Sequence, residues 1–410
     1  MLRSKKISMK WLALAALMLP FSASAQDKEL VVWHSYRGKE KEAIIQVVDN
    51  FNKKVAGQGY KFKPLAIPYD AYADKVTAAV PRGKGPDVFI FAQDRLGGWI
   101  EAGNTVEPLD FFIEDETKEQ FLPATMKAMV YRDTTYGLPL NYKMVLMIYN
   151  KKLVKNPPST TGELVAFAKA NTNAAAGQFG LAYSYSDYFY HSALQNAFGG
   201  RVFDAGPKPV LDAPENIKAL EFLMNWLKVD KILPEEPSTA LITSLFNKDK
   251  AAIVFNGPWF LGEISPDVDF GLATLPTVDE AGGAPMQPWM TVEGAYIAAP
   301  SKNKDESYEF LKYITSLEAA KIMALVGRQT PANKAVYDIA EVKADPILNA
   351  IREQAKTAVP MPNYPEMTMV WSPATTAMNQ IVKGAATPAQ AMGDAQKKVA
   401  ADVASLRKSN

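Results

Sequence analysis

The sequence contains no cysteine and only two histidines, His34 and His191, among its 410 residues. The absence of cysteine excludes disulfides, thiolate metal sites, cysteine nucleophiles and a lipid-modified N-terminal cysteine. Two histidines leave most nucleophile–base and metal-ligand sets without their usual residues. No G-x-S-x-G elbow, Walker A loop or H-E-x-x-H motif occurs either. Carboxylates are plentiful, so a glycoside hydrolase with two catalytic carboxylates stays open as an alternative.

The sequence also has no long apolar run. The longest apolar stretch lies near the N-terminus, at 11–21. It is too short to span a hydrocarbon core of about 30 Å. Four basic residues precede it and Ala23-Ser24-Ala25 follows, which is the pattern of a cleavable secretory signal. We predict a signal peptide at 1–25 and a mature chain from Gln26. Without a lipid anchor, the protein is expected in the periplasm of a bacterium with two membranes.

The charge of the mature chain is close to balanced. Removing the signal leaves 41 of the 45 basic residues against 44 acidic ones, a net charge of about −3. This balance does not favour binding to nucleic acid or to an anionic membrane. A mature chain of 385 residues exceeds the single-core limit of about 250 to 300 residues, so we expect two domains.

The N-terminal third alternates between strand and helix patterns. Short apolar strands are predicted at 29–34, 60–67 and 87–91, with helical spacing at 44–51 and 71–80 between them. This alternation is typical of an α/β layer with a mostly parallel sheet. Ligands bind such sheets beyond the carboxyl ends of the strands, so the loops after Trp33 and Phe91 are candidate binding loops.

A second alternation runs from about 145 to 288, with strands predicted at 147–150, 179–184, 251–256 and 270–274. No linker rich in proline, glycine or serine separates the two regions. Two domains without a linker indicate that the chain crosses between them more than once, as in a hinge.

Aromatic residues stand at turn-like positions outside the periodic apolar runs. Trp259 follows Asn256-Gly257-Pro258, and Trp371 ends a proline-rich segment that begins at Val359. An aromatic face suits the C–H face of a sugar, and the neighbouring pair Asp94 and Arg95 offers acceptors and donors to hydroxyl groups. These features together favour a binding site for a small sugar.

Six segments resemble the periplasmic maltose/maltodextrin-binding proteins, which are solute-binding components of ABC importers. They are GPDVFIFAQDRLGG at 85–98, IYNKKLVKNPP at 148–158, FNK at 246–248, FNGPW at 255–259, LPT at 275–277 and MPNYPEM at 361–367 leading to Trp371. The resemblance implies an α/β two-lobe clamshell, with an N-terminal lobe at 26–141 and 293–343 and a C-terminal lobe at 146–288 and 347–410. The hinge is then expected near 141–146, 288–293 and 343–347.

The resemblance also implies a function and a site. The protein would be a monomer that captures maltodextrin between its lobes and delivers it to a membrane permease, with no catalytic residue, metal or cofactor. Phe91 takes the place of a stacking Trp, and Phe189 or Tyr190 that of a stacking Tyr. Three positions depart from the pattern, because Tyr36 stands where an acid is expected, Lys143 replaces a Glu and Thr375 an Arg. The implied ligand-binding residues are Tyr36, Arg37, Phe91, Asp94, Arg95, Lys143, Asp187, Phe189, Tyr190, Trp259, Trp371 and Thr375.

Alternatives remain open for the ligand and for individual residues. The same fold accommodates trehalose, another oligosaccharide or a non-sugar solute. Asp94 and Arg95 can be read as a surface ion pair, which contributes about 0 to 1 kcal/mol. Phe189 and Tyr190 can be core residues, and Lys143 and Tyr36 can lie on a solvated rim.

Overall fold

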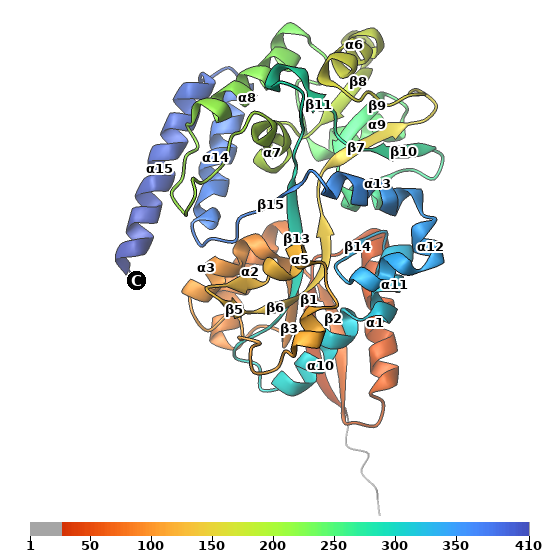
Figure 1. The fold of residues 1–410 in the computed structure, drawn as a ribbon, viewed down its shortest axis with the longest axis vertical. Helices are drawn as coiled ribbons and strands as arrows, with labels where there is room; N and C mark the ends of the chain where they lie inside the picture. The colour runs from red at the N-terminus through yellow and green to blue at the C-terminus, as the bar shows by residue number, and fades with distance from the viewer. Residues whose placement is uncertain (1–26, 410) are drawn as a thin grey trace, which may run out of the picture.

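The computed structural model describes residues 27–409, with side chains described as far as 405, so the predicted signal peptide lies outside the described residues. Two larger sheets organise this part of the chain, one with seven strands and one with four. In Figure 1 they lie one above the other, joined by strands that run from one half of the molecule to the other. Among the described residues, no helix has both the length and the apolar character needed to cross a membrane.

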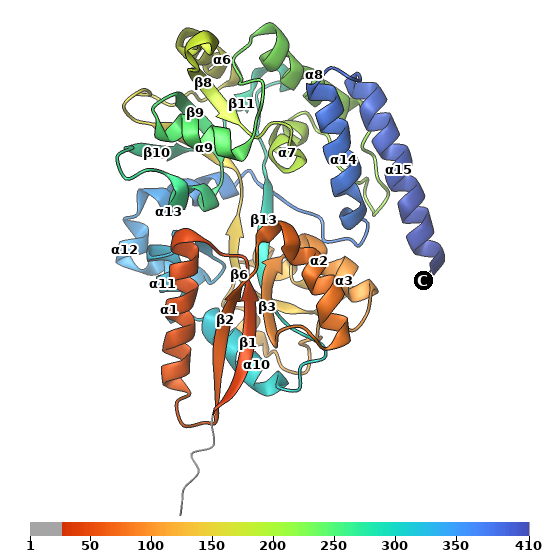
Figure 2. The same ribbon diagram turned by 180° about the vertical axis from the view of Figure 1, so that it is seen from behind.

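The seven-stranded sheet begins with the three strands expected from the sequence. Strands β1 (Lys28–His34), β2 (Tyr60–Ala66) and β3 (Val88–Ala92) are parallel, with β1 between the other two. Helices α1 (Gly38–Lys54) and α2 (Tyr69–Ala79) connect them, which confirms the predicted alternation. Figure 2 shows α1 beside β2, and α2 and α3 (Leu96–Glu101) beside β3.

The remaining strands of this sheet break the predicted parallel pattern. Strand β13 (Trp289–Ile297) pairs antiparallel with β3, and β6 (Gly137–Lys143) pairs antiparallel with β13. The order is β14-β6-β13-β3-β1-β2, and β15 (Val359–Pro360) joins β13 at its other end. Because β13 enters from the other half of the molecule, it runs against the strands that start within this half.

The four-stranded sheet has the order β10-β7-β9-β8. Its strands are β7 (Leu146–Asn150), β8 (Phe179–Tyr183), β9 (Ala251–Asn256) and β10 (Phe270–Ala273), within one residue of the predicted ranges. Successive residues on these strands point to opposite faces, so Met147 and Ile253 join one apolar cluster while Ile148 and Val254 join another.

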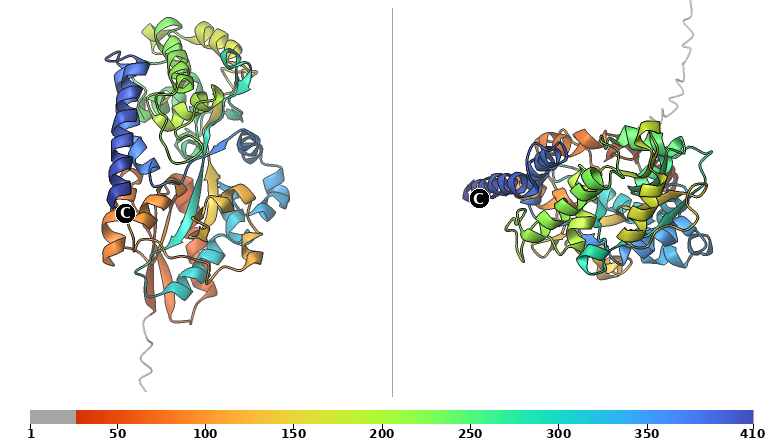
Figure 3. Two further views of the ribbon diagram at one scale, coloured as in Figure 1. Left: turned by 60° about the vertical axis from the view of Figure 1, so that its left-hand side comes forward. Right: turned by 90° about the horizontal axis from the view of Figure 1, so that it is seen from above.

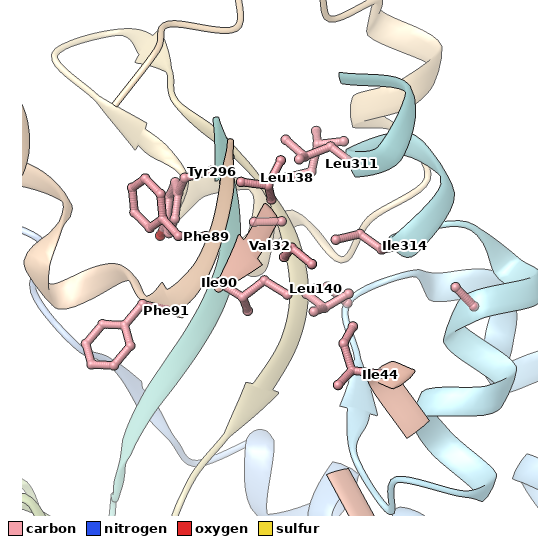
Figure 4. Packing of buried hydrophobic residues seen from close by; sticks show 14 of the residues in the cluster. Val32, Ile44, Phe89, Ile90, Phe91, Leu138, Leu140, Tyr296, Leu311 and Ile314 are labelled. Atoms are coloured by element: carbon pink, nitrogen blue, oxygen red, sulfur yellow. The ribbon is translucent and has the colours of Figure 1, made fainter. Parts of the chain in front are cut away.

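The buried side chains form a first core around the seven-stranded sheet and a second core, in two clusters, around the four-stranded sheet. Figure 4 shows the first core, where Val32, Ile90 and Leu140 face Ile44 of α1 and Ile314 of α10 (Lys304–Ile314). Phe89, Phe91 and Tyr296 lie on the opposite face of the sheet. The described residues therefore have a separate core for each of the two larger sheets.

Three segments pass between the two cores. Strand β6 leads directly into β7, β13 begins beside the second core and ends in the first, and β15 runs parallel to the start of β13. The buried side chain of Gln93 ties two of them together, because it accepts from Val292 N at 2.7 Å and donates to Met361 O at 3.2 Å. Leu348 and Ile351 of α13 (Pro346–Ala355) pack in the first core, beyond the crossing predicted at 343–347.

The other elements complete the layers, and Figure 3 shows α14 and α15 along one side of the molecule. The remaining helices are α4 (Asp115–Lys118), α5 (Pro123–Lys127), α6 (Thr161–Asn171), α7 (Tyr188–Ala197), α8 (Pro214–Met224), α9 (Thr239–Asn247), α11 (Leu317–Leu325), α12 (Ala340–Lys343), α14 (Met367–Val382) and α15 (Pro388–Ser409). The remaining strands are β4 (Val130–Tyr131), β5 (Thr134–Thr135), β11 (Thr277–Val278), β12 (Ala284–Pro285) and β14 (Thr330–Pro331). Short 3₁₀ or π turns are η1 (Val80–Arg82), η2 (Gln93–Arg95), η3 (Ala174–Ala176), η4 (Asn225–Val229), η5 (Pro258–Glu263), η6 (Asp279–Ala281) and η7 (Lys334–Asp338).

Candidate functional site

A buried polar cluster lies where β1, α1, β6 and β13 meet. Lys143, the last residue of β6, places its Nζ 2.7 Å from Glu40 Oε1 and 3.2 Å from Glu293 Oε1. Tyr36 donates its hydroxyl to Glu293 Oε2 at 2.9 Å and accepts from Asn141 Nδ2 at 3.1 Å. All five side chains are buried, so the alternative that Lys143 and Tyr36 lie on a solvated rim is wrong.

The charged groups in this polar cluster shift the pKa values of their neighbours. Burial alone would lower the pKa of Lys143, but the carboxylates of Glu293 and Glu40 outweigh that effect and raise it. Burial raises the pKa of Glu293, and Lys143 only partly offsets this. The pKa of Tyr36 rises through burial and the nearby Glu293. One cation therefore neutralises one of two carboxylates, and Glu293 tends to keep a proton more readily than an exposed glutamate.

Sequence reasoning missed both acids of the polar cluster. Tyr36 stands where the resemblance implies an acid, and the structure supplies Glu40 one turn further along and Glu293 from a distant strand. Glu40 lies in the first turn of α1, where the helix dipole favours a carboxylate. Its position near the start of a predicted helix is therefore a feature of the sequence from which it could have been identified. Glu293 borders a register shift between β13 and β6, which no alternating pattern reveals.

Arg37 points away from the polar cluster and pairs with the second core. Its Nη2 lies 2.9 Å from Glu263 Oε1, at the end of η5. Its neighbour Gly38 has a φ of +51°, and a Cβ built there would lie 3.9 Å from Gly262 O. The start of α1 and the end of η5 thus come into close contact, and an ion pair joins the two cores at this point.

A second contact between the cores involves Asp94, Arg95 and Trp371. Asp94 is buried, and its Oδ2 accepts from Trp371 Nε1 at 3.2 Å. Arg95 Nε lies 3.2 Å from the same oxygen, and its guanidinium carbon is 5.9 Å from the centre of the Trp371 ring. Burial raises the pKa of Asp94, while Arg95 and Trp371 act against the rise. The alternative of a surface ion pair is therefore wrong for Asp94.

Five neighbouring aromatic rings form an aromatic wall on the second core, made of Phe189, Tyr190, Trp259, Trp289 and Trp371. Their ring centres are about 6 Å apart, from 5.8 Å between Trp289 and Trp371 to 6.4 Å between Tyr190 and Trp259. Trp289 is fully buried, whereas the other four rings keep part of their surface exposed. Phe189 and Tyr190 are therefore not core residues, because each retains an exposed part beside Trp259.

The ring of Trp259 lies directly over Gly257. A Cβ at position 257 would lie only 2.2 Å from two ring carbons, so only glycine fits beneath this ring. Tyr190 donates its hydroxyl to Asn256 Oδ1 at 3.0 Å, and the same oxygen accepts from Gly257 N at 2.9 Å. The turn at 256–258 thus positions two rings of the aromatic wall, Trp259 and Tyr190.

Asp187 and Thr375 are exposed at the borders of the aromatic wall. Asp187 caps α7, because its Oδ1 accepts from Phe189 N at 2.8 Å, which leaves its second oxygen available. Desolvation by the surrounding protein raises the pKa of the Asp187 carboxyl, and the hydrogen bond from Phe189 N acts against the rise. Thr375 lies on the exposed side of α14. The described contacts include none between Thr375 and Lys143.

Phe91 and Tyr69 occupy unexpected positions. Phe91 is only 4% exposed, and its ring stacks on Tyr72 at 4.6 Å and 5°. Tyr69 is 60% exposed, with its ring 5.2 Å from Phe91. Desolvation and the charges of Asp94, Glu293 and Asp187 raise the pKa of Tyr69. Asp94 and Glu293 come from the first core and Asp187 from the second, so charges from both cores act on the hydroxyl of Tyr69. Sequence reasoning missed it, although a tyrosine beside Pro68 at the start of a helix was a readable signal.

The arrangement has the chemistry of a sugar-binding site. The aromatic wall offers ring faces, and Asp94, Arg95 and Asp187 add charged acceptors and donors for hydroxyl groups. Within residues 27–409, no group of three or more histidine or carboxylate side chains has the geometry to hold a metal ion.

Comparisons with known proteins agree with this geometry. A family model described as bacterial extracellular solute-binding protein matches residues 46–350. The maltotriose-binding protein of Pyrococcus abyssi (strain GE5 / Orsay) is 32% identical over 368 residues, which cover 88% of this chain and 79% of that protein. The galactooligosaccharide-binding protein of Bacillus subtilis (strain 168) is 26% identical over 388 residues, 91% of this chain and 89% of that protein.

A solved structure supports the same assignment. The crystal structure of a cyclo/maltodextrin-binding protein complexed with maltotetraose has a TM-score of 0.79 and 30% identity to this chain. The match covers 93% of this chain and 98% of the other. The chain therefore belongs to the bacterial extracellular solute-binding protein family, shares its mixed α/β clamshell fold, and acts as a binding protein and not as an enzyme.

Proposed function

We propose that the protein captures maltose or a maltodextrin between its two cores and delivers it to the membrane permease of an ABC importer. One observation carries this proposal: Asp94 and Arg95 of the first core meet Trp371 of the second core. The same place therefore brings together charged hydrogen-bonding groups and an aromatic face, which sugars require together. Family membership removes the alternative of a glycoside hydrolase.

The ligand lies against the aromatic wall in this proposal. Trp259, Trp371 and Phe189 or Tyr190 offer their faces to glucosyl rings, and Tyr69 covers them from the first core. Asp94, Arg95 and Asp187 bind hydroxyl groups. Lys143 and Tyr36 act through the polar cluster, because their own polar atoms are already bonded to Glu40, Glu293 and Asn141. The ring of Phe91 packs against the ring of Tyr69.

Two lobes that close around the sugar complete the proposal. In this proposal the lobes have the boundaries expected from the resemblance, with crossings near 141–146, 288–293 and 343–347. Closure excludes water from the sugar, and the closed form is recognised by the permease. The signal peptide at 1–25 directs the chain to the periplasm, where it acts without a lipid anchor.

A galactooligosaccharide is the second candidate ligand. The Bacillus subtilis relative that matches 91% of this chain is named for that sugar. Both sugars offer pyranose faces and hydroxyl groups, so the aromatic wall accommodates either in principle. They differ in the direction of one hydroxyl group and in their linkages, and these features are recognised by hydrogen-bonding groups such as Asp94 and Asp187.

Isothermal titration calorimetry on the chain from Gln26 tests the proposal. The ligands are maltose, maltotriose, maltotetraose, galactobiose, trehalose and sucrose. We expect the maltodextrins to bind with a stoichiometry of one and to raise the melting temperature, since a ligand at 100 times its Kd stabilises by about 2.7 kcal/mol. Tighter binding of galactobiose would replace the ligand in the proposal, and no binding of any sugar would overturn it.

A further inference from the structure

A cavity of about 250 Å³ lies beside the crossing strands, apart from Asp94, Arg95 and Trp259. Its walls come from the end of α7, from 201–204, from the start of β13 and from 359–364. Pockets for drug-sized ligands measure about 300 to 1,000 Å³, so this cavity has the size for one ring and little more. Six of its residues carry the argument: Asn196, Arg201, Phe203, Asp204, Trp289 and Tyr364.

The apolar lining of this cavity combines three aromatic side chains with two valines and two prolines. Phe203 and Tyr364 meet edge to face, with their ring centres 5.7 Å apart and their planes at 85°. Trp289 belongs both to the cavity and to the aromatic wall, where its ring centre is 5.8 Å from that of Trp371. Aromatic faces at right angles present a flat surface and an edge, which suits a ring with C–H faces and polar edges.

The polar part of the cavity is the guanidinium of Arg201, the carboxylate of Asp204 and the amide of Asn196, whose Nδ2 already donates to Gln287 O at 2.8 Å. Arg201 Nη1 donates to Gly200 O at 2.6 Å and lies near Asn196 O, which orients the guanidinium with backbone acceptors. Asp204 Oδ1 accepts from Gly206 N at 2.9 Å. Both residues are exposed, and within residues 27–409 Arg201 forms no ion pair with a carboxylate and Asp204 forms none with a cation. Both groups therefore keep hydrogen-bonding capacity, and their charges balance.

An aspartate, an arginine and a tryptophan also occur together at the candidate sugar site, although Trp289 of the cavity is almost fully buried and Trp371 is not. We infer that this cavity is a second sugar site, which takes a single neutral hexose. A balanced Asp and Arg pair suits hydroxyl groups better than a charged ligand, because either charge on the ligand would face one like charge. The inference rests on the proposed function through this likeness, but its test is separate, since the cavity shares only Trp289 with the aromatic wall.

The position of the cavity connects it to the crossings between the cores. Trp289 pairs with Val359 in the parallel ladder of β13 and β15, and Val359 N donates to Pro288 O at 2.9 Å. A hexose in the cavity contacts both crossing segments and the end of α7 at once. It therefore binds most tightly to one arrangement of these segments and shifts the population of the others.

Titration with D-glucose tests the second site. The protein is first saturated with maltotriose, so that the aromatic wall is occupied, and glucose binding is then measured by calorimetry. We expect glucose to bind the saturated protein and to bind Trp371→Ala equally well. Arg201→Met should weaken this binding by about tenfold or more, because a hydrogen bond to a charged group is lost. Arg82→Met, an exposed arginine outside both sites, is the matched control and should leave it unchanged.

Three results would overturn the inference. They are no glucose binding to the saturated protein, glucose binding that Trp371→Ala abolishes, and glucose binding that Arg201→Met leaves unchanged. Circular dichroism and the melting temperature of Arg201→Met separate loss of the site from loss of the fold, and Asp204→Asn provides an independent second variant. If maltotriose itself fails to bind, the proposed function fails, and the glucose titration on the free protein and on Arg201→Met still decides the second site.

Discussion

The polar cluster and the aromatic wall differ in how far their side chains are engaged by contacts within the protein. In the polar cluster, the amine of Lys143 and the hydroxyl of Tyr36 are bonded to buried partners. In the aromatic wall, Phe189 meets Trp259 and Trp371 meets Trp289 through tilted or edge-to-face rings, and Phe189, Trp259 and Trp371 keep exposed surface. Protein partners occupy the amine and the hydroxyl of the first region, whereas the rings of the second region keep surface open to a ligand.

This difference teaches which residues carry stability and which carry affinity. Removal of a group from the polar cluster leaves a buried charge without its partner, so the cost falls on folding. Removal of a ring from the aromatic wall exposes little that is not already exposed, so the cost falls on the bound ligand. The following substitutions break or sharpen this contrast, from the largest expected effect to the smallest.

Lys143→Met should destabilise the protein most. It leaves the carboxylates of Glu40 and Glu293 buried without a cation, and breaking a buried ion pair in this way costs about 3 to 5 kcal/mol. The urea midpoint of unfolding should fall accordingly. The triple variant Lys143→Met, Glu40→Gln and Glu293→Gln should recover part of the loss. An unchanged midpoint for the single variant would show that the polar cluster contributes nothing to folding.

Phe91→Ala should lower stability, whereas Tyr69→Ala should lower affinity for the sugar, although the two rings are in contact. Phe91 is buried, and truncation of a buried Phe costs about 3 to 5 kcal/mol of stability. Tyr69 is exposed, so its truncation should change stability by less than about 0.5 kcal/mol. Thermal unfolding and maltotriose titration of both variants distinguish the roles. Loss of affinity without loss of stability in Phe91→Ala would assign the ligand face to Phe91 instead.

Trp371→Ala should weaken maltodextrin binding by about 1 to 3 kcal/mol, by analogy with stacking of bases on aromatic side chains. Trp371→Phe keeps a face but removes the Nε1 donor to Asp94, so it should lose less. Calorimetry measures both, and far-ultraviolet circular dichroism should stay the same. A large fall in melting temperature with unaltered affinity would make Trp371 a structural residue.

Arg37→Met should have the smallest effect on stability. Its ion pair with Glu263 is largely exposed, and such pairs contribute about 0 to 1 kcal/mol. Because this pair joins the two cores, its loss should favour separated cores in the absence of sugar. Small-angle scattering of the free protein should therefore show a larger radius of gyration for Arg37→Met than for Lys39→Met, an exposed neighbour that pairs within its own helix. Equal radii would restrict Arg37 to a local role.

Much of the fold could be predicted from the sequence because its signals are local. The alternation of short apolar strands with helical spacing located β1, β2 and β3, and the four strands of the second sheet lie within one residue of the predicted ranges. The directions of β6 and β13 were not predicted, because a strand that crosses between two cores has the same periodicity as one that stays within a core.

The candidate site was less predictable, since it depends on contacts between distant residues. Asp94 and Trp371 are 277 positions apart, and Tyr36 and Glu293 are 257 apart. The resemblance located Trp259 and Trp371, but it gave no sign of the burial of Lys143 or of the two acids that surround it. Tyr69 was missed because exposure and proximity to both cores are properties of the folded chain alone.

The direct passage of β6 into β7 limits how the two halves can move. Strand β6 is held to β13 along its length, and β7 is held between β9 and β10. Sliding one half past the other would pull these ladders out of register, whereas bending needs only rotation at Met144 and Val145, which lie between the two paired regions. The two halves should therefore rotate about a hinge at Met144 and Val145. Each time they close, Asp94 should meet Trp371 at the same position.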